Sequence, residues 1–100
     1  MILLPGAVQR QIGQRLRALR VAESWTQEDL AARSGVGVAT VRRAEKSGNI
    51  TLPNLLRLAA TLGALDSFTQ ILRVPEPISL DAVVRPVRRR VRRKLSEQNA

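Results

Sequence analysis

Apolar residues recur at helical spacing along the first three quarters of the chain. From Val8 onward they fall on one helical face, at Val8, Ile12, Leu16 and Leu19. This period is typical of an amphipathic helix that packs one side against a core. We therefore expect a first helix that starts at Val8 and ends near Glu23–Ser24.

A second helix is predicted from its start signals. Thr26 is a good N-cap residue, and Asp29 stands three positions later, where a capping box requires an acid. Trp25 and Leu30 occupy the two positions of a hydrophobic staple around this cap. The helix should continue to about Ser34.

Only a tight turn separates this helix from the next. Gly35 fits the position that follows a helix end, and the Val36 side chain should be buried on the inner side of the turn. The third helix is expected from Val38 to about Lys46, with Val41 and Ala44 facing inward.

Two further helices complete the pattern. Thr51 should cap a fourth helix that Gly63 ends, with apolar residues at Leu55, Leu56, Leu58, Ala59 and Leu62. A short fifth helix is expected over Leu65–Leu72. We predict an all-α domain of five helices over residues 8–74, and a linker with a basic C-terminal extension over residues 75–100.

Composition narrows the chemistry. The chain contains no cysteine and no histidine, which excludes disulfides, zinc fingers and histidine acid–base catalysis. We expect no enzyme activity, no metal and no cofactor. The two aromatic residues, Trp25 and Phe68, give no platform for stacking single-stranded bases.

The charge predicts the kind of partner. Seventeen Lys and Arg against eight Asp and Glu give a net charge of +9, which favours an anionic partner such as nucleic acid. The apolar start, Met1 to Val8, lacks the charged leader of a signal peptide, and no apolar run is long enough to span a membrane. We expect a cytoplasmic bacterial protein that is nucleoid-associated when bound, with no membrane partner.

Two short helices joined by a glycine turn are the pattern of the helix-turn-helix. The segment Thr26–Val36 (TQEDLAARSGV), followed by Thr40–Glu45 (TVRRAE), resembles the lambda repressor/Cro-like family, also called the XRE family. The resemblance covers roughly Ile12 to Leu72. It implies a five-helix lambda-repressor-like fold that binds double-stranded DNA.

The third helix is the candidate for reading bases. Inward packing by Val41 and Ala44 leaves four side chains pointing outward: Val38, Ala39, Arg42 and Arg43. In domains of this family such positions enter the major groove, where Arg can bind guanine and small apolar side chains can touch thymine methyls. The alternative for each of these side chains is a solvated surface, and a helix-turn-helix can also be plain helix packing.

The resemblance assigns further roles. It places Gln27 on a DNA phosphate, and the other candidate phosphate contacts are Thr26, Thr40, Lys46 and Asn49. It also pairs Arg20 with Glu45 as a structural ion pair, so Glu45 is not a catalytic acid.

Two positions depart from the family pattern. Gly37 stands where Ser or Thr usually caps the third helix, which weakens that cap. In the family pattern a Gly usually stands two residues after the Glu that corresponds to Glu45. Here Ser47 occupies that position, and Gly48 comes one residue later. The turn after the third helix, and any phosphate contacts there, are therefore expected to differ.

The extension after the linker is strongly basic. Its candidate phosphate-binding or partner-binding residues are Arg88, Arg89, Arg90, Arg92, Arg93 and Lys94. Val87, Val91 and Leu95 among them are compatible with a basic amphipathic helix, and equally with a solvated charged tail.

The layout, including the segment from Leu62 to Leu80, resembles the HipB-type antitoxins that accompany HipA-like kinase toxins. That resemblance implies a homodimer that represses its own operon at an inverted-repeat operator and helps to inhibit the kinase. Two alternatives stay open: a stand-alone phage-type or chromosomal repressor, and a basic RNA-associated structural protein.

Overall fold

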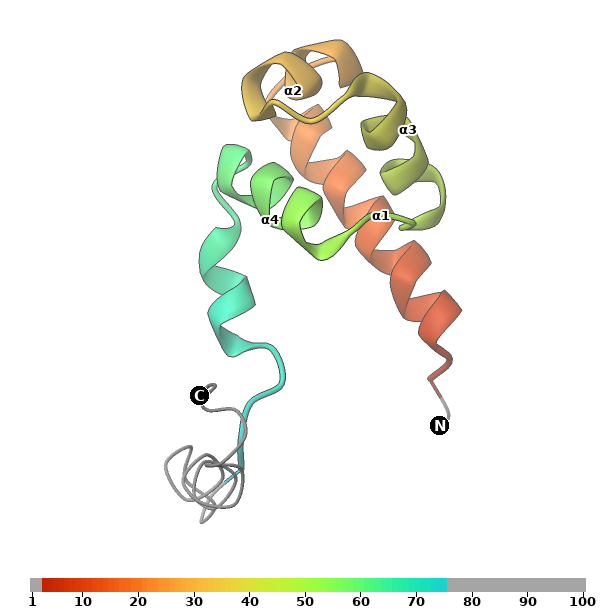
Figure 1. Ribbon diagram of the computed structural model, residues 1–100, viewed down its shortest axis with the longest axis vertical. Helices are drawn as coiled ribbons and strands as arrows, with labels where there is room; N and C mark the ends of the chain where they lie inside the picture. Colours follow the sequence, from red (N-terminus) through yellow and green to blue (C-terminus); the bar gives the residue numbers. More distant parts are fainter. Residues whose placement is uncertain (1–2, 76–100) are drawn as a thin grey trace, which may run out of the picture. The chain divides into compact units, whose positions relative to one another are not determined.

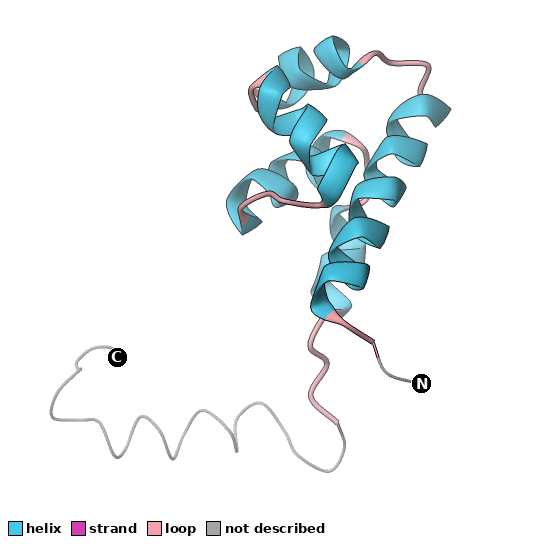
Figure 2. Ribbon diagram, turned by 90° about the vertical axis from the view of Figure 1, so that its right-hand side faces the viewer, coloured by secondary structure: helices cyan, strands magenta, loops and turns pink. Residues whose placement is uncertain are grey.

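The computed structural model describes residues 3–75, and these are all helix or loop (Figures 1 and 2). Four α-helices, α1 (Pro5–Ala22), α2 (Gln27–Ser34), α3 (Val38–Ser47) and α4 (Leu52–Thr61), are followed by the 3₁₀ helix η1 (Leu65–Gln70). The chain divides into two units, Met1–Thr69 and Gln70–Ala100. The expected all-α class is confirmed. The boundary predicted at residues 74 and 75 stays a prediction.

The core lies where α1, α2, α3 and α4 meet. α1 packs on α3, and α2 packs on both α3 and α4. The largest fully buried side chains are Leu30, Val41 and Leu58, one from each of α2, α3 and α4. Trp25 and Phe68 are partly buried against the same cluster. The two aromatic residues therefore serve the core.

Local signals set most helix ends as expected. The capping box of α2 is present in full: the Asp29 N–H donates to Thr26 Oγ1 over 3.0 Å, and the Thr26 N–H donates to Asp29 Oδ2 over 2.8 Å. Thr51 caps α4 by accepting from the Asn54 N–H. Gly37 gives α3 no side-chain cap, as the departure from the family pattern predicts.

The first helix differs from the expectation in its start. It begins at Pro5, three residues before Val8, with Pro5 in the first turn and Leu4 in an extended conformation as the N-cap residue. Proline is well tolerated there because its missing N–H would have no helical partner. The pattern of apolar residues could not reveal this additional first turn, because the apolar residues next to it, Leu3 and Leu4, are exposed and do not pack against the core.

The buried face of α1 agrees with the predicted one at Leu16, which is buried, and at Ile12, which packs against the core, and differs from it at other positions. Val8 and Leu19 are 37% and 39% exposed, whereas Gly13, Leu16 and Arg20 are buried. The cause is the close crossing of α3. A Cβ on Gly13 would collide with the backbone oxygen of Ala44, so this glycine, and not a larger apolar residue, marks the contact line.

The fifth helix is a 3₁₀ helix that ends at Gln70, and not a helix that runs to Leu72. Two hydroxyl groups donate to carbonyls three residues back, Ser67 Oγ to Ala64 O over 2.9 Å and Thr69 Oγ1 to Asp66 O over 2.8 Å. Such bonds compete with the α-helical pattern and accompany the tighter 3₁₀ turn.

Candidate nucleic-acid interface

α2 and α3 are joined by three residues, Gly35 to Gly37. Gly35 adopts a left-handed conformation with φ of 77°, and its N–H donates to the Ala31 carbonyl. Residues with a side chain rarely adopt this conformation, which is why glycine is needed here. Val36 is buried in the core and anchors the turn there.

The third helix has a buried side and an exposed side. Val41 and Ala44 are fully buried, whereas Ala39, Arg42 and Arg43 are exposed. Val38 is half-buried, so less of it is free to touch a base than the sequence suggests. The four candidate base-contacting residues therefore lie along one side of α3, with Val38 at its edge.

Arg42 is engaged in an ion pair. Its Nη2 donates to Glu28 Oε2 on α2 over 2.8 Å, and the two side chains are 53% and 65% exposed. Arg43 has no ion-pair partner within residues 3–75. Of the two arginines, Arg43 is thus the one whose guanidinium is free to meet a base.

A buried network connects α1, α2 and α3. The Arg20 guanidinium donates from Nε and Nη2 to the two carboxylate oxygens of Glu45, over 2.8 and 2.9 Å. Its Nη1 donates to the Trp25 carbonyl over 2.7 Å, and Gln27 Nε2 donates to Glu45 Oε1 over 3.1 Å. The structure thus contains the ion pair implied by the resemblance and adds Gln27 to it.

The network sets the charge state of Glu45. Burial would raise the pKa of the Glu45 carboxyl, but hydrogen bonds from Arg20 and Gln27 and the nearby charges of Arg20 and Arg17 outweigh it. The net result is a pKa below the ordinary value, so Glu45 stays ionised at neutral pH. A buried carboxylate held by so many donors is a structural anchor.

The candidate phosphate contacts fall into two groups. Thr26 and Gln27 lie at the start of α2, where free N–H groups and the helix dipole favour an anion. Lys46 and Asn49 lie at the far end of α3 and are exposed. Thr40, in the first turn of α3, is half-buried.

The turn after α3 is held by a glycine and by side-chain hydrogen bonds. Gly48 ends the helix in a left-handed conformation with φ of 76°, and Ser47 Oγ donates to the Arg43 carbonyl over 3.0 Å. Gln9 Nε2 on α1 donates to the Gly48 carbonyl over 3.2 Å. A Cβ on Gly48 would collide with the backbone of Gln9, so the end of α3 is seated directly on α1.

Some candidate features are not described by the structure. The basic tail residues, from Arg88 to Lys94, lie outside the described residues. Within residues 3–75 there is no cluster of acidic side chains that could hold a metal ion, and no helix long and apolar enough to cross a membrane.

Sequence reasoning missed three residues of this region. Glu28 was not among the candidate residues, although it pairs with Arg42 fourteen positions away. Gly13 and Arg17 carried no role, although Gly13 allows α3 to approach and Arg17 lies near Glu45. The one available signal was Gly13 itself, because a glycine inside a helix weakens it unless another backbone comes close.

Comparison with known proteins identifies this arrangement. A family model described as helix-turn-helix matches residues 16–67, which include α2, α3, α4 and the buried network. Neither a curated protein nor a solved structure gave a match. The match covers more than half of the chain and coincides with the glycine turn and the exposed side of α3. The chain therefore belongs to the helix-turn-helix family of the lambda repressor/Cro-like (XRE) class, whose domains are DNA-binding transcription regulators.

Proposed function

We propose that this protein is a sequence-specific repressor that binds an inverted-repeat operator in double-stranded DNA as a homodimer. The observation that carries the proposal is the two-sided α3. Its inner side is buried, and its outer side presents Ala39 and Arg43, and Arg43 has no ion-pair partner within residues 3–75. A helix of this kind fits the major groove, where Arg binds guanine through two hydrogen bonds.

The dimer follows from the size of the interface. A single small domain buries too little surface on DNA for tight specific binding. Two recognition helices placed about 34 Å apart, one turn of DNA, would read the two halves of a palindrome. The homodimer is thus part of the proposal.

The test is selection of binding sites from a random duplex library, followed by footprinting on the DNA upstream of the gene. An inverted repeat bound by two chains supports the proposal. Binding without sequence preference, or binding of one chain to a single half-site, would refute it.

The narrower proposal is an antitoxin that represses the operon of a HipA-like kinase. It is supported by the order of the parts: a helix-turn-helix domain, the segment over residues 62–80, and a basic extension. Co-purification with a kinase encoded beside it tests this. A stand-alone repressor would bind its operator equally well and retain no kinase.

A further inference from the structure

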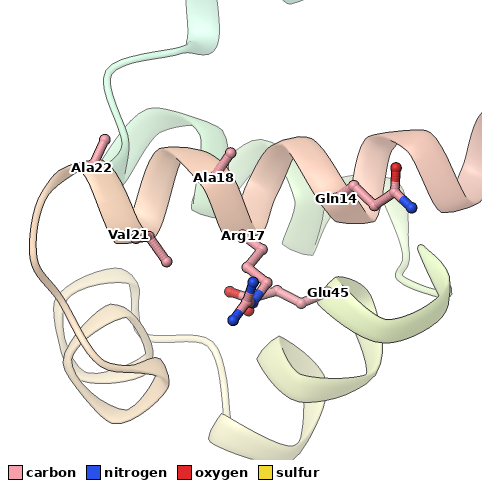
Figure 3. A pocket seen from close by; sticks show the side chains of 6 residues that line it. All are labelled: Gln14, Arg17, Ala18, Val21, Ala22 and Glu45. Carbon is pink, nitrogen blue, oxygen red and sulfur yellow. The ribbon is translucent and has the colours of Figure 1, made fainter.

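A shallow hollow lies beside the buried network on the outer side of α1. Figure 3 shows the residues that line it, which are Gln14, Arg17, Ala18, Val21, Ala22 and Glu45. Its volume is about 460 Å³. Five of the six residues belong to α1 and only Glu45 belongs to α3, so the hollow is formed almost entirely by one face of α1. Small-molecule pockets bury most of the ligand surface, which this hollow cannot do.

The hollow carries an unmatched positive charge. The carboxylate of Glu45 is already neutralised by Arg20 through two hydrogen bonds. Arg17 lies close enough for its charge to lower the pKa of Glu45, yet it is exposed and has no ion-pair partner within residues 3–75. Arg17, Arg20 and Glu45 therefore sum to one positive charge, and Arg17, which lines the hollow, is the cation without an ion-pair partner in the described residues.

The hollow adjoins the start of α2. Gln27, the first residue of α2, donates to the same Glu45 carboxylate that forms part of the hollow. The free N–H groups of the first turn of α2 are the proposed place of one DNA phosphate. A polyanion with regularly spaced phosphates that passes α2 would therefore present a neighbouring phosphate to Arg17.

The walls fit the rest of a nucleotide backbone. The hollow is lined by three small apolar side chains, those of Ala18, Val21 and Ala22. Val21 is 52% exposed, so it is accessible to a ligand. Deoxyribose presents carbon–hydrogen groups beside each phosphate, so an apolar wall next to a guanidinium complements a sugar-phosphate unit.

We infer that this hollow is a subsite for the backbone of double-stranded DNA, in which Arg17 binds a phosphate and Ala18 and Val21 contact the adjoining deoxyribose. The inference rests on the proposed function and extends the interface from α2 and α3 onto α1. Arg17 adds affinity for any sequence, because it touches no base.

The first experiment measures how DNA affinity depends on salt. Each phosphate contact contributes about 0.9 to the slope of log affinity against log salt concentration. Arg17→Gln is expected to lower the slope by that amount for operator and random duplexes alike, and Arg17→Lys to restore it. Arg15→Gln removes the same charge from the same helix, but Arg15 does not line the hollow. It is expected to leave the slope unchanged.

The second experiment locates the contact. Ethylation of single phosphates should reveal one whose modification weakens the wild type but has no effect on Arg17→Gln. Ala18→Phe, which fills the hollow without changing charge, should lower DNA affinity several-fold. Ala60→Phe is the control, since Ala60 is an exposed alanine of α4 outside the hollow.

The outcomes separate this inference from the proposed function. If the wild type binds an operator but Arg17→Gln and Arg15→Gln behave alike, the subsite is refuted and the function stands. The subsite is also refuted, and the function stands, if ethylation shows that Arg17→Gln and Arg15→Gln lose the same phosphate contacts. If the wild type binds no duplex, the proposed function fails and the subsite falls with it.

Discussion

The guanidinium of Arg20 binds both carboxylate oxygens of Glu45, from residues 25 positions apart in the sequence. Because Arg20 lies on α1 and Glu45 on α3, the pair fixes the direction of α3 relative to α1. Arg20 also binds the carbonyl of Trp25, just before α2 begins. One side chain therefore holds three segments of the domain.

This pair predicts a specific dependence of stability on pH. The pKa of Glu45 is lower in the folded protein than in the unfolded chain, where it is about 4.3. Its ionisation therefore stabilises the fold above that value, and the contribution disappears as the pH falls through the lower folded pKa. We expect the difference in unfolding free energy between wild type and Glu45→Gln to be constant near neutral pH and to shrink in acid.

Denaturant unfolding of both proteins from pH 7 to pH 2.5 measures this difference. Asp29 also has a lowered pKa, through its hydrogen bonds to Thr26, but both proteins retain it. Its contribution cancels in the comparison. A difference that grows in acid would contradict the assignment.

The second prediction concerns the crossing of α1 and α3. Gly13→Ala should destabilise the protein by about 1–3 kcal/mol, because overpacking of a close contact forces backbones apart. The new Cβ would meet the Ala44 oxygen and also lie 3.0 Å from the Gly48 nitrogen. Gly6→Ala on the same helix is the control, since its Cβ would only approach Arg10 at 3.8 Å. Equal stability of the two variants in urea unfolding would show that α3 does not rest on Gly13.

The third prediction separates base reading from phosphate binding. Arg43→Ala should relax base preference in each half-site, with a loss of about 1–3 kcal/mol for the operator and little for random DNA. Gln27→Ala should weaken binding to both evenly, because its proposed contact is to phosphate. Affinities for operator and scrambled duplexes at one salt concentration decide this. A uniform loss with Arg43→Ala would disprove its role as a base contact.

The fourth prediction concerns Glu28, which holds Arg42 in the free protein. Glu28→Gln removes a negative charge beside the proposed phosphate site and frees the Arg42 guanidinium. We expect tighter binding to random duplexes and an unchanged melting temperature, since exposed ion pairs contribute only about 0–1 kcal/mol. Glu23→Gln supplies the same charge change away from Arg42. If Glu23→Gln and Glu28→Gln bind DNA with the same affinity, the ion pair between Glu28 and Arg42 has no role in DNA binding.

The fifth prediction concerns the extension over residues 75–100, which holds seven of the 17 basic residues. A chain that ends at Val74 should keep its operator preference and lose part of the salt dependence, because fewer counterions are released on binding. It should also lose any kinase partner that binds the extension. Loss of sequence preference in a truncated chain that still folds would show that the extension reads bases or builds the dimer.

The sequence predicted what local chemistry decides. The capping box of Thr26 and Asp29 and the left-handed Gly35 need only near neighbours, and both are present in the structure. The Arg20–Glu45 pair spans 25 positions and was reached only through the family resemblance.

Features that depend on packing were missed. Apolar spacing placed Ile12 and Leu16 correctly on the packed side of α1, but it did not predict that Gly13 and Arg20 are buried. Gly13 is buried because α3 comes so close that a Cβ would collide with the Ala44 oxygen. The pairing of Glu28 with Arg42 depends on how α2 and α3 are turned toward each other. No spacing rule along one helix contains that information.

The separation of the two sides of α3 has a consequence for how this regulator evolves. Val41 and Ala44 hold the helix in place, while Ala39 and Arg43 contribute nothing to the core. A duplicated gene could therefore exchange its outer residues one at a time and acquire a different target sequence without passing through an unfolded intermediate. Paralogues in one genome would diverge first at these positions, so that each copy stops binding the other's DNA site.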